Sequence, residues 1–148
     1  MDDAIRELSA DAIIKIGGWH PRYARVLLIE HDGADAVVLV DGNGDGAELE
    51  LEYWHRGSDG TWSGGSSSGH GGLDFLPSSQ SWNAGPFVVA LGRVAPATQV
   101  TVEYGGHTYY RTASQLGIWG FIHPADSAQP GELPAVTISW PRWPDAEP

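Results

Sequence analysis

The chain has 148 residues, with 8 lysines and arginines against 19 aspartates and glutamates, a formal net charge of -11, no cysteine, 20 glycines and 7 tryptophans. This length suits one domain with a core of its own. The acidity disfavours binding to nucleic acid or to an anionic membrane, both of which require a basic footprint, and the lack of cysteine excludes disulfides and thiolate zinc sites.

An N-terminal helix is predicted over residues 2–16, because Ile5, Leu8 and Ala12 recur at helical spacing and Gly17-Gly18 ends the pattern. The first residues carry neither the basic nor the apolar segment of a signal peptide. No apolar run approaches the roughly 18 residues that cross a bilayer. We therefore expect a cytoplasmic protein by default, with secretion after removal of a leader left open.

Residues 22–140 show short apolar segments separated by turn signals, which predicts strands rather than helices. The expected strands cover residues 24–30, 36–40, 47–54, 60–63, 86–94, 98–104, 107–112, 117–122 and 135–140. This pattern indicates a mainly β protein, an antiparallel Ig-like or related β-sandwich of about eight to nine short strands. We expect a single domain over residues 1–148, with the helix packed on the sandwich or engaged in a homo-oligomer contact.

A stretch rich in glycine and serine, residues 64–85, lacks any periodicity. We expect it to form either one long loop or a seam between two parts of the chain, residues 22–63 and 86–140. A loop of this length inside a compact domain is usually functional or mobile. The proline-rich tail over residues 141–148 predicts no regular element.

The most specific motif is a calcium-loop pattern, D-x-[DN]-x-[DN]-G-x5-E, formed by Asp41, Asn43, Asp45 and Glu52, with Glu48 between them. Alternating short carboxylates on a glycine-rich turn can converge on one calcium ion. The segment also resembles the calcium loops between strands of integrin-type propeller repeats. The flanking sequence predicts strand–turn–strand rather than an EF-hand, so a hairpin loop built on Asn-Gly and Asp-Gly turns is the alternative.

Three glutamates alternate with apolar residues after this loop: Glu48, Glu50 and Glu52. On a strand they fall on one face, with neighbours about 6.7 Å apart. One interpretation is a solvated face that discourages pairing between sheet edges. The other is an acidic interaction face for a basic partner.

The seven tryptophans suggest carbohydrate binding, because sugar rings stack on flat aromatic faces. Four lie in segments that predict exposure: Trp62, Trp82, Trp140 and Trp143. Trp54 and Trp119 lie within strand patterns and are predicted to be core residues. The expected partner is accordingly an unidentified protein or glycan.

A third class, a small hydrolase, is suggested by the pattern G-x-S-x-G over residues 65–69, with Ser67 at its centre and His70 close by. A nucleophile elbow requires a strand before the serine and a helix after it, in a large parallel sheet. The serine–glycine run predicts neither, so no catalytic residue is assigned.

Two stretches resemble known groups of proteins. Residues 86–122 resemble a bacterial Ig-like module, with a valine-rich strand, a turn at Pro96, and the segment Gly117-Ile118-Trp119-Gly120-Phe121 closing the unit. Residues 53–63, which end in Asp-Gly-Thr-Trp before a glycine–serine run, resemble small uncharacterised proteins of high-GC bacteria. These resemblances imply a β-sandwich and no particular activity.

Taken together, the sequence predicts a non-enzymatic binding or interaction protein. The alternatives are a calcium-dependent or carbohydrate-binding module, with calcium at residues 41–52 as its cofactor, and, less favoured, a small hydrolase.

Overall fold

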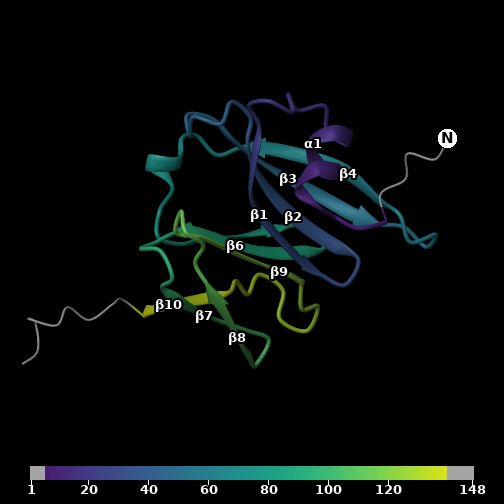
Figure 1. The fold of residues 1–148 in the computed structure, drawn as a ribbon. Helices are drawn as coiled ribbons and strands as arrows, with labels where there is room; N and C mark the ends of the chain where they lie inside the picture. The colour runs from purple at the N-terminus through teal and green to yellow at the C-terminus, as the bar shows by residue number, and fades with distance from the viewer. Residues whose placement is uncertain (1–5, 140–148) are drawn as a thin grey trace, which may run out of the picture. The chain divides into compact units, whose positions relative to one another are not determined.

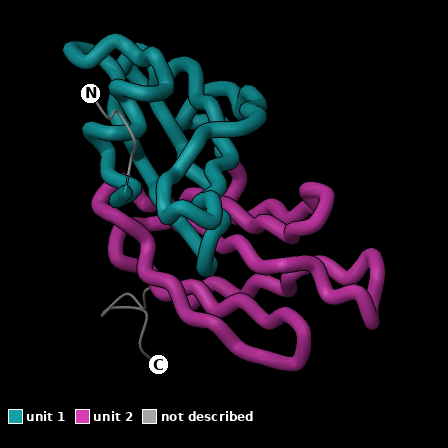
Figure 2. The backbone as a smooth tube through the Cα atoms, turned by 90° about the vertical axis from the view of Figure 1, so that its right-hand side faces the viewer, with its two compact units in different colours: residues 1–76 teal, residues 77–148 magenta. Residues whose placement is uncertain are grey.

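The computed structural model describes residues 6–139 and shows a mainly β protein, with ten antiparallel strands in three sheets and one short N-terminal α-helix (Figure 1). The chain divides into two compact units, Met1–Leu76 and Pro77–Pro148 (Figure 2). No helix in the described part of the chain is long and apolar enough to span a membrane.

Unit 1 contains one four-stranded sheet in which each strand pairs with the next along the chain, in the order β1-β2-β3-β4. Its elements are α1 (Ala10–Ile16), β1 (Arg25–Asp32), β2 (Asp35–Asp41), β3 (Leu49–Arg56), β4 (Trp62–Gly69) and the short 3-10 helix η1 (Leu73–Phe75). The register of this meander places β3 in the interior of the sheet and leaves β1 and β4 at its edges.

The helix α1 packs its only fully buried residue, Ile13, into the core of unit 1. That core also contains Ala36, Val38 and Val40 of β2 together with Trp54 and Trp62. The helix begins at Ala10, later than predicted, because the Ser9 side chain accepts a hydrogen bond from the Ala12 N–H and so caps the first turn. Residues 2–5 of the predicted helix lie outside the described residues.

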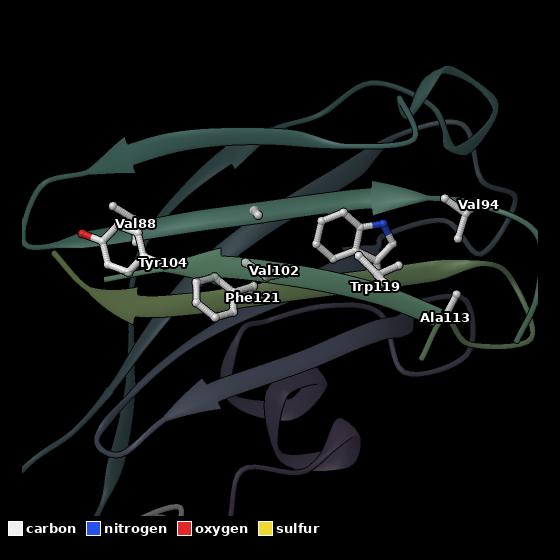
Figure 3. Close-up of a cluster of buried hydrophobic side chains, with 9 residues drawn as sticks. Val88, Val94, Val102, Tyr104, Ala113, Trp119 and Phe121 are labelled. Atoms are coloured by element: carbon white, nitrogen blue, oxygen red, sulfur yellow. The ribbon is translucent and has the colours of Figure 1, made fainter. Parts of the chain in front are cut away.

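Unit 2 consists of two three-stranded sheets, with strand orders β5-β6-β9 and β10-β7-β8. Its strands are β5 (Gln80–Ala84), β6 (Phe87–Arg93), β7 (Gln99–Tyr104), β8 (His107–Thr112), β9 (Ile118–Pro124) and β10 (Ala135–Ser139). Side chains from both sheets meet in one buried cluster, to which β6 contributes Val88, β7 contributes Val102, and β9 contributes Trp119 and Phe121 (Figure 3). The two sheets of this unit therefore share a core, as in a small sandwich.

The glycine–serine stretch differs from the predicted loop over residues 64–85. Trp62–Gly69 forms β4, Leu73–Phe75 forms η1, and Gln80–Ala84 forms β5. The boundary between the two units, after Leu76, falls inside this stretch, for which the sequence predicts either a loop or a seam between two parts of the chain. Serine and glycine have low strand propensity, so β4 depends on its pairing with β3 rather than on its own sequence.

Candidate functional site

The loop after β2 is organised by the carboxylate of Asp41. Asp41 is only 4% exposed, and its Oδ1 and Oδ2 accept hydrogen bonds from the N–H groups of Gly44 at 3.1 Å and Gly46 at 2.8 Å. Asp45 Oδ1 accepts in turn from the Ala47 N–H at 3.0 Å. Both oxygens of Asp41 thus hold the loop backbone, the arrangement expected of an aspartate that closes a turn.

The predicted calcium ligands do not converge. In the β2–β3 ladder, Glu52 lies opposite Val38 and Leu49 lies opposite Asp41, so Glu52 and Asp41 are separated by three residues along the strands, a distance of about 10 Å. Asn43 and Glu48 are exposed on the loop. Over residues 6–139 there is no group of three or more histidine and acidic side chains that could hold a metal ion. The geometry favours the turn interpretation of this segment.

Glu52 instead lies on the face of the sheet that packs against α1, and its carboxylate is hydrogen-bonded there. Its Oε2 accepts a hydrogen bond from the indole Nε1–H of Trp19 at 2.9 Å, and its Oε1 accepts from the indole Nε1–H of Trp54 at 3.1 Å. Trp54 is 3% exposed, while Glu52 and Trp19 are half-buried. A carboxylate that accepts two N–H donors is well compensated for its partial burial.

The indole ring of Trp19 lies against two glycines. A Cβ atom at Gly42 would lie 2.8 Å from Trp19 Cζ3, and one at Gly17 would lie 2.9 Å from Trp19 Cδ1. Gly17 has a helical φ of -71°, a conformation open to any residue. A Cβ atom at Gly17 would also lie 2.7 Å from the Ile13 carbonyl oxygen. The lack of a side chain at Gly42 therefore makes room for the ring, and at Gly17 it makes room for both the ring and this carbonyl, while Glu52 accepts a hydrogen bond from the ring Nε1–H.

A groove of about 480 Å³ opens beside this ring. It is lined by Asp11, Ile14 and Lys15 of α1 and by Trp19 and Pro21 after the helix. Within residues 6–139, the side chains of Asp11 and Lys15 form neither a hydrogen bond nor an ion pair. The groove thus combines an aromatic ring, a carboxylate and an ammonium group.

Of the four predicted stacking tryptophans, the structure describes Trp62 in unit 1 and Trp82 in unit 2. Trp62 is 8% exposed and belongs to the core of unit 1, where the Arg56 guanidinium lies 5.7 Å from its ring centroid. Trp82 lies half-buried on β5 in unit 2, and Trp140 and Trp143 lie outside the described residues. The predicted core positions of Trp54 and Trp119 are confirmed, at 3% and 1% exposure.

The edge strand β4 is the second candidate for a binding site in unit 1. Within the described residues it pairs with β3 alone, and its residues 63–69 are all exposed. Glu50 of β3 lies opposite Gly69, and a Cβ atom there would sit 3.8 Å from Glu50 Oε1. Of the predicted acidic face, Glu48 is exposed and Glu50 is half-buried beside β4, whereas Glu52 is bonded to the tryptophans. The three glutamates therefore do not form one uniform solvated row.

At the end of β4 a serine lies close to a histidine, but it is Ser68 rather than Ser67. Ser68 Oγ is 3.3 Å from His70 Nε2. Burial lowers the pKa of His70, and the nearby Glu50 carboxylate opposes this shift. Ser68 is exposed and β4 leads into a three-residue 3-10 helix, so the strand–helix context of a nucleophile elbow is not present here.

Comparison with known proteins finds no relative of this chain, so its function is inferred from the geometry described above. The sequence matches no protein-family model, and no match was found among curated proteins or solved structures. Of the resemblances suggested by the sequence, the structure supports the coarser statement of a mainly β chain with three antiparallel sheets.

Trp19 is the residue that sequence reasoning missed. It lies in a Gly-Gly-Trp-His segment with no strand or helix pattern. Its partners Gly42 and Glu52 follow 23 and 33 residues later, and only the sheet register brings them together. The glycine pair preceding it predicts the end of a helix, and no local signal indicates that Gly17 also lies against an indole ring.

Proposed function

We propose that this chain is a non-enzymatic binding protein, and that the free edge of β4 accepts an extended, basic segment of a partner polypeptide as an added strand. The observation that carries the proposal is the exposure of residues 63–69 on a strand with one neighbour in the described part of the chain. Strand addition of this kind draws its affinity from main-chain hydrogen bonds and its specificity from the side chains beside the edge.

The backbone groups available on β4 follow from its pairing. The His70 N–H donates to the Leu49 carbonyl at 2.9 Å, so His70 directs its backbone toward β3. Because successive residues of a strand direct their N–H and C=O groups to opposite sides, Ser67 and Gly69 direct theirs outward. These groups form a ready template for another strand.

The composition of β4 does little to prevent another strand from pairing with this edge. The strand reads WSGGSSSG and contains no lysine, arginine or proline, the residues that commonly block an edge. Its protection is one irregularity in the pairing, between the partners of Glu52 and Trp54. The stretch from Ser67 to Gly69 lies beyond that irregularity and pairs regularly with β3.

Charge selects the kind of partner. Residues 30–59, which run from the end of β1 through β2 and β3 into the turn before β4, carry nine acidic residues and one arginine. Because Gly69 has no side chain, the Glu50 carboxylate is within reach of a lysine or arginine on a strand added to β4. Complementary charge of this kind favours basic segments and disfavours acidic ones.

The experiment is a titration of the full chain into a dye-labelled peptide that alternates lysine with threonine, followed by fluorescence anisotropy. A peptide with glutamate in place of lysine is the matched ligand control. We expect saturable binding of the basic peptide and at least about tenfold weaker binding of the acidic one, since like charges at an interface are strongly unfavourable.

Three variants separate the backbone contribution from the charge contribution. Ser67→Pro removes an outward N–H without removing a bond to β3, and should weaken binding by about tenfold or more. Ser67→Ala keeps the N–H and should bind as the unaltered chain does. Glu50→Gln should weaken binding about two- to fivefold, the effect of one partly exposed ion pair. Equal binding by Ser67→Pro and Ser67→Ala would overturn the proposal.

A further inference from the structure

A second site, independent of the β4 edge, lies in the groove beside α1. We propose that this groove binds a neutral sugar ring, which stacks on the indole of Trp19 and hydrogen-bonds to Asp11 and Lys15. The proposal rests on three features: the positioned ring, the two charged side chains that have no partner within residues 6–139, and the size of the groove.

The ring is held in place before any ligand arrives. The Glu52 carboxylate fixes its Nε1 end at 2.9 Å, and Gly42 and Gly17 fit against its carbon atoms. Trp19 is nevertheless half-buried rather than fully enclosed. A ring that is held in one orientation and still open to a groove loses little conformational freedom when a ligand binds.

The polar groups of the groove suit hydroxyl groups. Asp11 and Lys15 are four residues apart on α1, so their side chains lie on one face of the helix, with Cβ atoms about 6 Å apart. The carboxylate accepts hydrogen bonds and the ammonium donates them, and neither is engaged within the described residues. Hydroxyl groups on a ring can donate to the first and accept from the second.

The balance of charge selects a neutral ligand. A quaternary ammonium ion would be attracted to the Trp19 ring and to Asp11 but repelled by Lys15, and an anion would be repelled by Asp11. The apolar C–H face of a sugar ring complements the negative face of an indole. A volume of about 480 Å³ lies within the range of roughly 300–1,000 Å³ typical of small-molecule sites.

The test is nuclear magnetic resonance of the full chain labelled with nitrogen-15, in which each tryptophan gives one indole N–H signal. Trp19→Phe identifies the signal of Trp19. Glucose, galactose, mannose and N-acetylglucosamine are titrated separately, with choline chloride as the cationic alternative. We expect the Trp19 signal to shift saturably with at least one of the sugars and to stay in place with choline.

Variants of the groove locate the binding. Asp11→Asn and Lys15→Met alter exposed helix residues and should each weaken sugar binding about tenfold, as expected for the loss of a hydrogen bond to a charged group. Gly42→Ala displaces the ring and should weaken binding by a similar factor. Glu48→Gln, an exposed glutamate that does not line the groove, is the control and should bind normally.

Three results would overturn the proposal. The first is that the Trp19 signal does not move with any of the four sugars. The second is that it moves with choline alone, which would make the groove a cation site. The third is a sugar-induced shift that is undiminished in both Asp11→Asn and Lys15→Met.

Discussion

Replacing Glu52 with alanine removes the acceptor shared by two indole N–H groups, at 2.9 Å for Trp19 and 3.1 Å for Trp54. Hydrogen bonds to a charged group each contribute about 1.5–3 kcal/mol. Both bonds are only partly buried, so water replaces part of what is lost. We therefore expect the free energy of unfolding to fall by about 2–4 kcal/mol in Glu52→Ala.

The assay is urea unfolding of unit 1, followed through the indole N–H signals of Trp19 and Trp54. Glu48→Ala is the matched control, because Glu48 is exposed and its loss should change stability by less than about 0.5 kcal/mol. Glu52→Gln keeps one acceptor oxygen and should fall between the two. If Glu52→Ala unfolds at the same urea concentration as Glu48→Ala, the tryptophan–carboxylate bridge does not stabilise unit 1.

Further outcomes follow from the other buried or bonded groups. Asp41→Ala removes both hydrogen bonds to the loop backbone and should lower the free energy of unfolding by about 3 kcal/mol. The Tm of the unaltered chain should be the same in millimolar calcium as in chelator. A rise in Tm with calcium would contradict the turn interpretation. Trp119→Ala should cost unit 2 about 3–5 kcal/mol, whereas Trp119→Phe, which loses only the 3.0 Å bond to the Ser78 carbonyl and part of the ring, should cost about 1–2 kcal/mol. Because burial lowers the pKa of His70 from its ordinary 6.5, the unfolded chain binds a proton first, so stability should decline as pH falls from above 6.5 toward the folded pKa; His70→Gln should lose this decline. A titration of the His70 ring signal should show a still lower pKa in Glu50→Gln, and an unchanged or higher pKa would contradict the influence of Glu50.

Local signals were sufficient where a hairpin turn set the structure. The predicted strands at 98–104 and 107–112 correspond to β7 (Gln99–Tyr104) and β8 (His107–Thr112). Gly105 and Gly106 between them both have positive φ, 59° and 77°, as a two-residue hairpin turn requires. The alternating valines and the glycine pair are therefore enough to predict this hairpin from the sequence.

Long-range pairing decided what local signals could not. Residues 62–69 have the composition of a flexible linker and form a strand because β3 lies beside them. The apolar pattern continues before Ser9 and therefore predicts too early a start for α1, whereas the Ser9 side chain caps the helix.

The candidate site was predicted least well, for the same reason. Glu52 alternates with leucines, and alternation alone predicts a solvated face. In the structure that face also carries Trp54 and meets Trp19 from after α1. Two indole N–H groups satisfy the carboxylate there, and this partnership spans 33 residues of sequence.

The central proposal, strand addition at β4, is tested most directly by amide hydrogen exchange at Ser67 and Gly69 with and without the peptide that alternates lysine with threonine. Their outward N–H groups should exchange quickly in the free chain and slowly in the complex, because each gains a carbonyl partner. The amide of His70, which already donates to Leu49, serves as the internal reference and should change much less. Binding of the peptide with unchanged exchange at Ser67 and Gly69 would contradict the account.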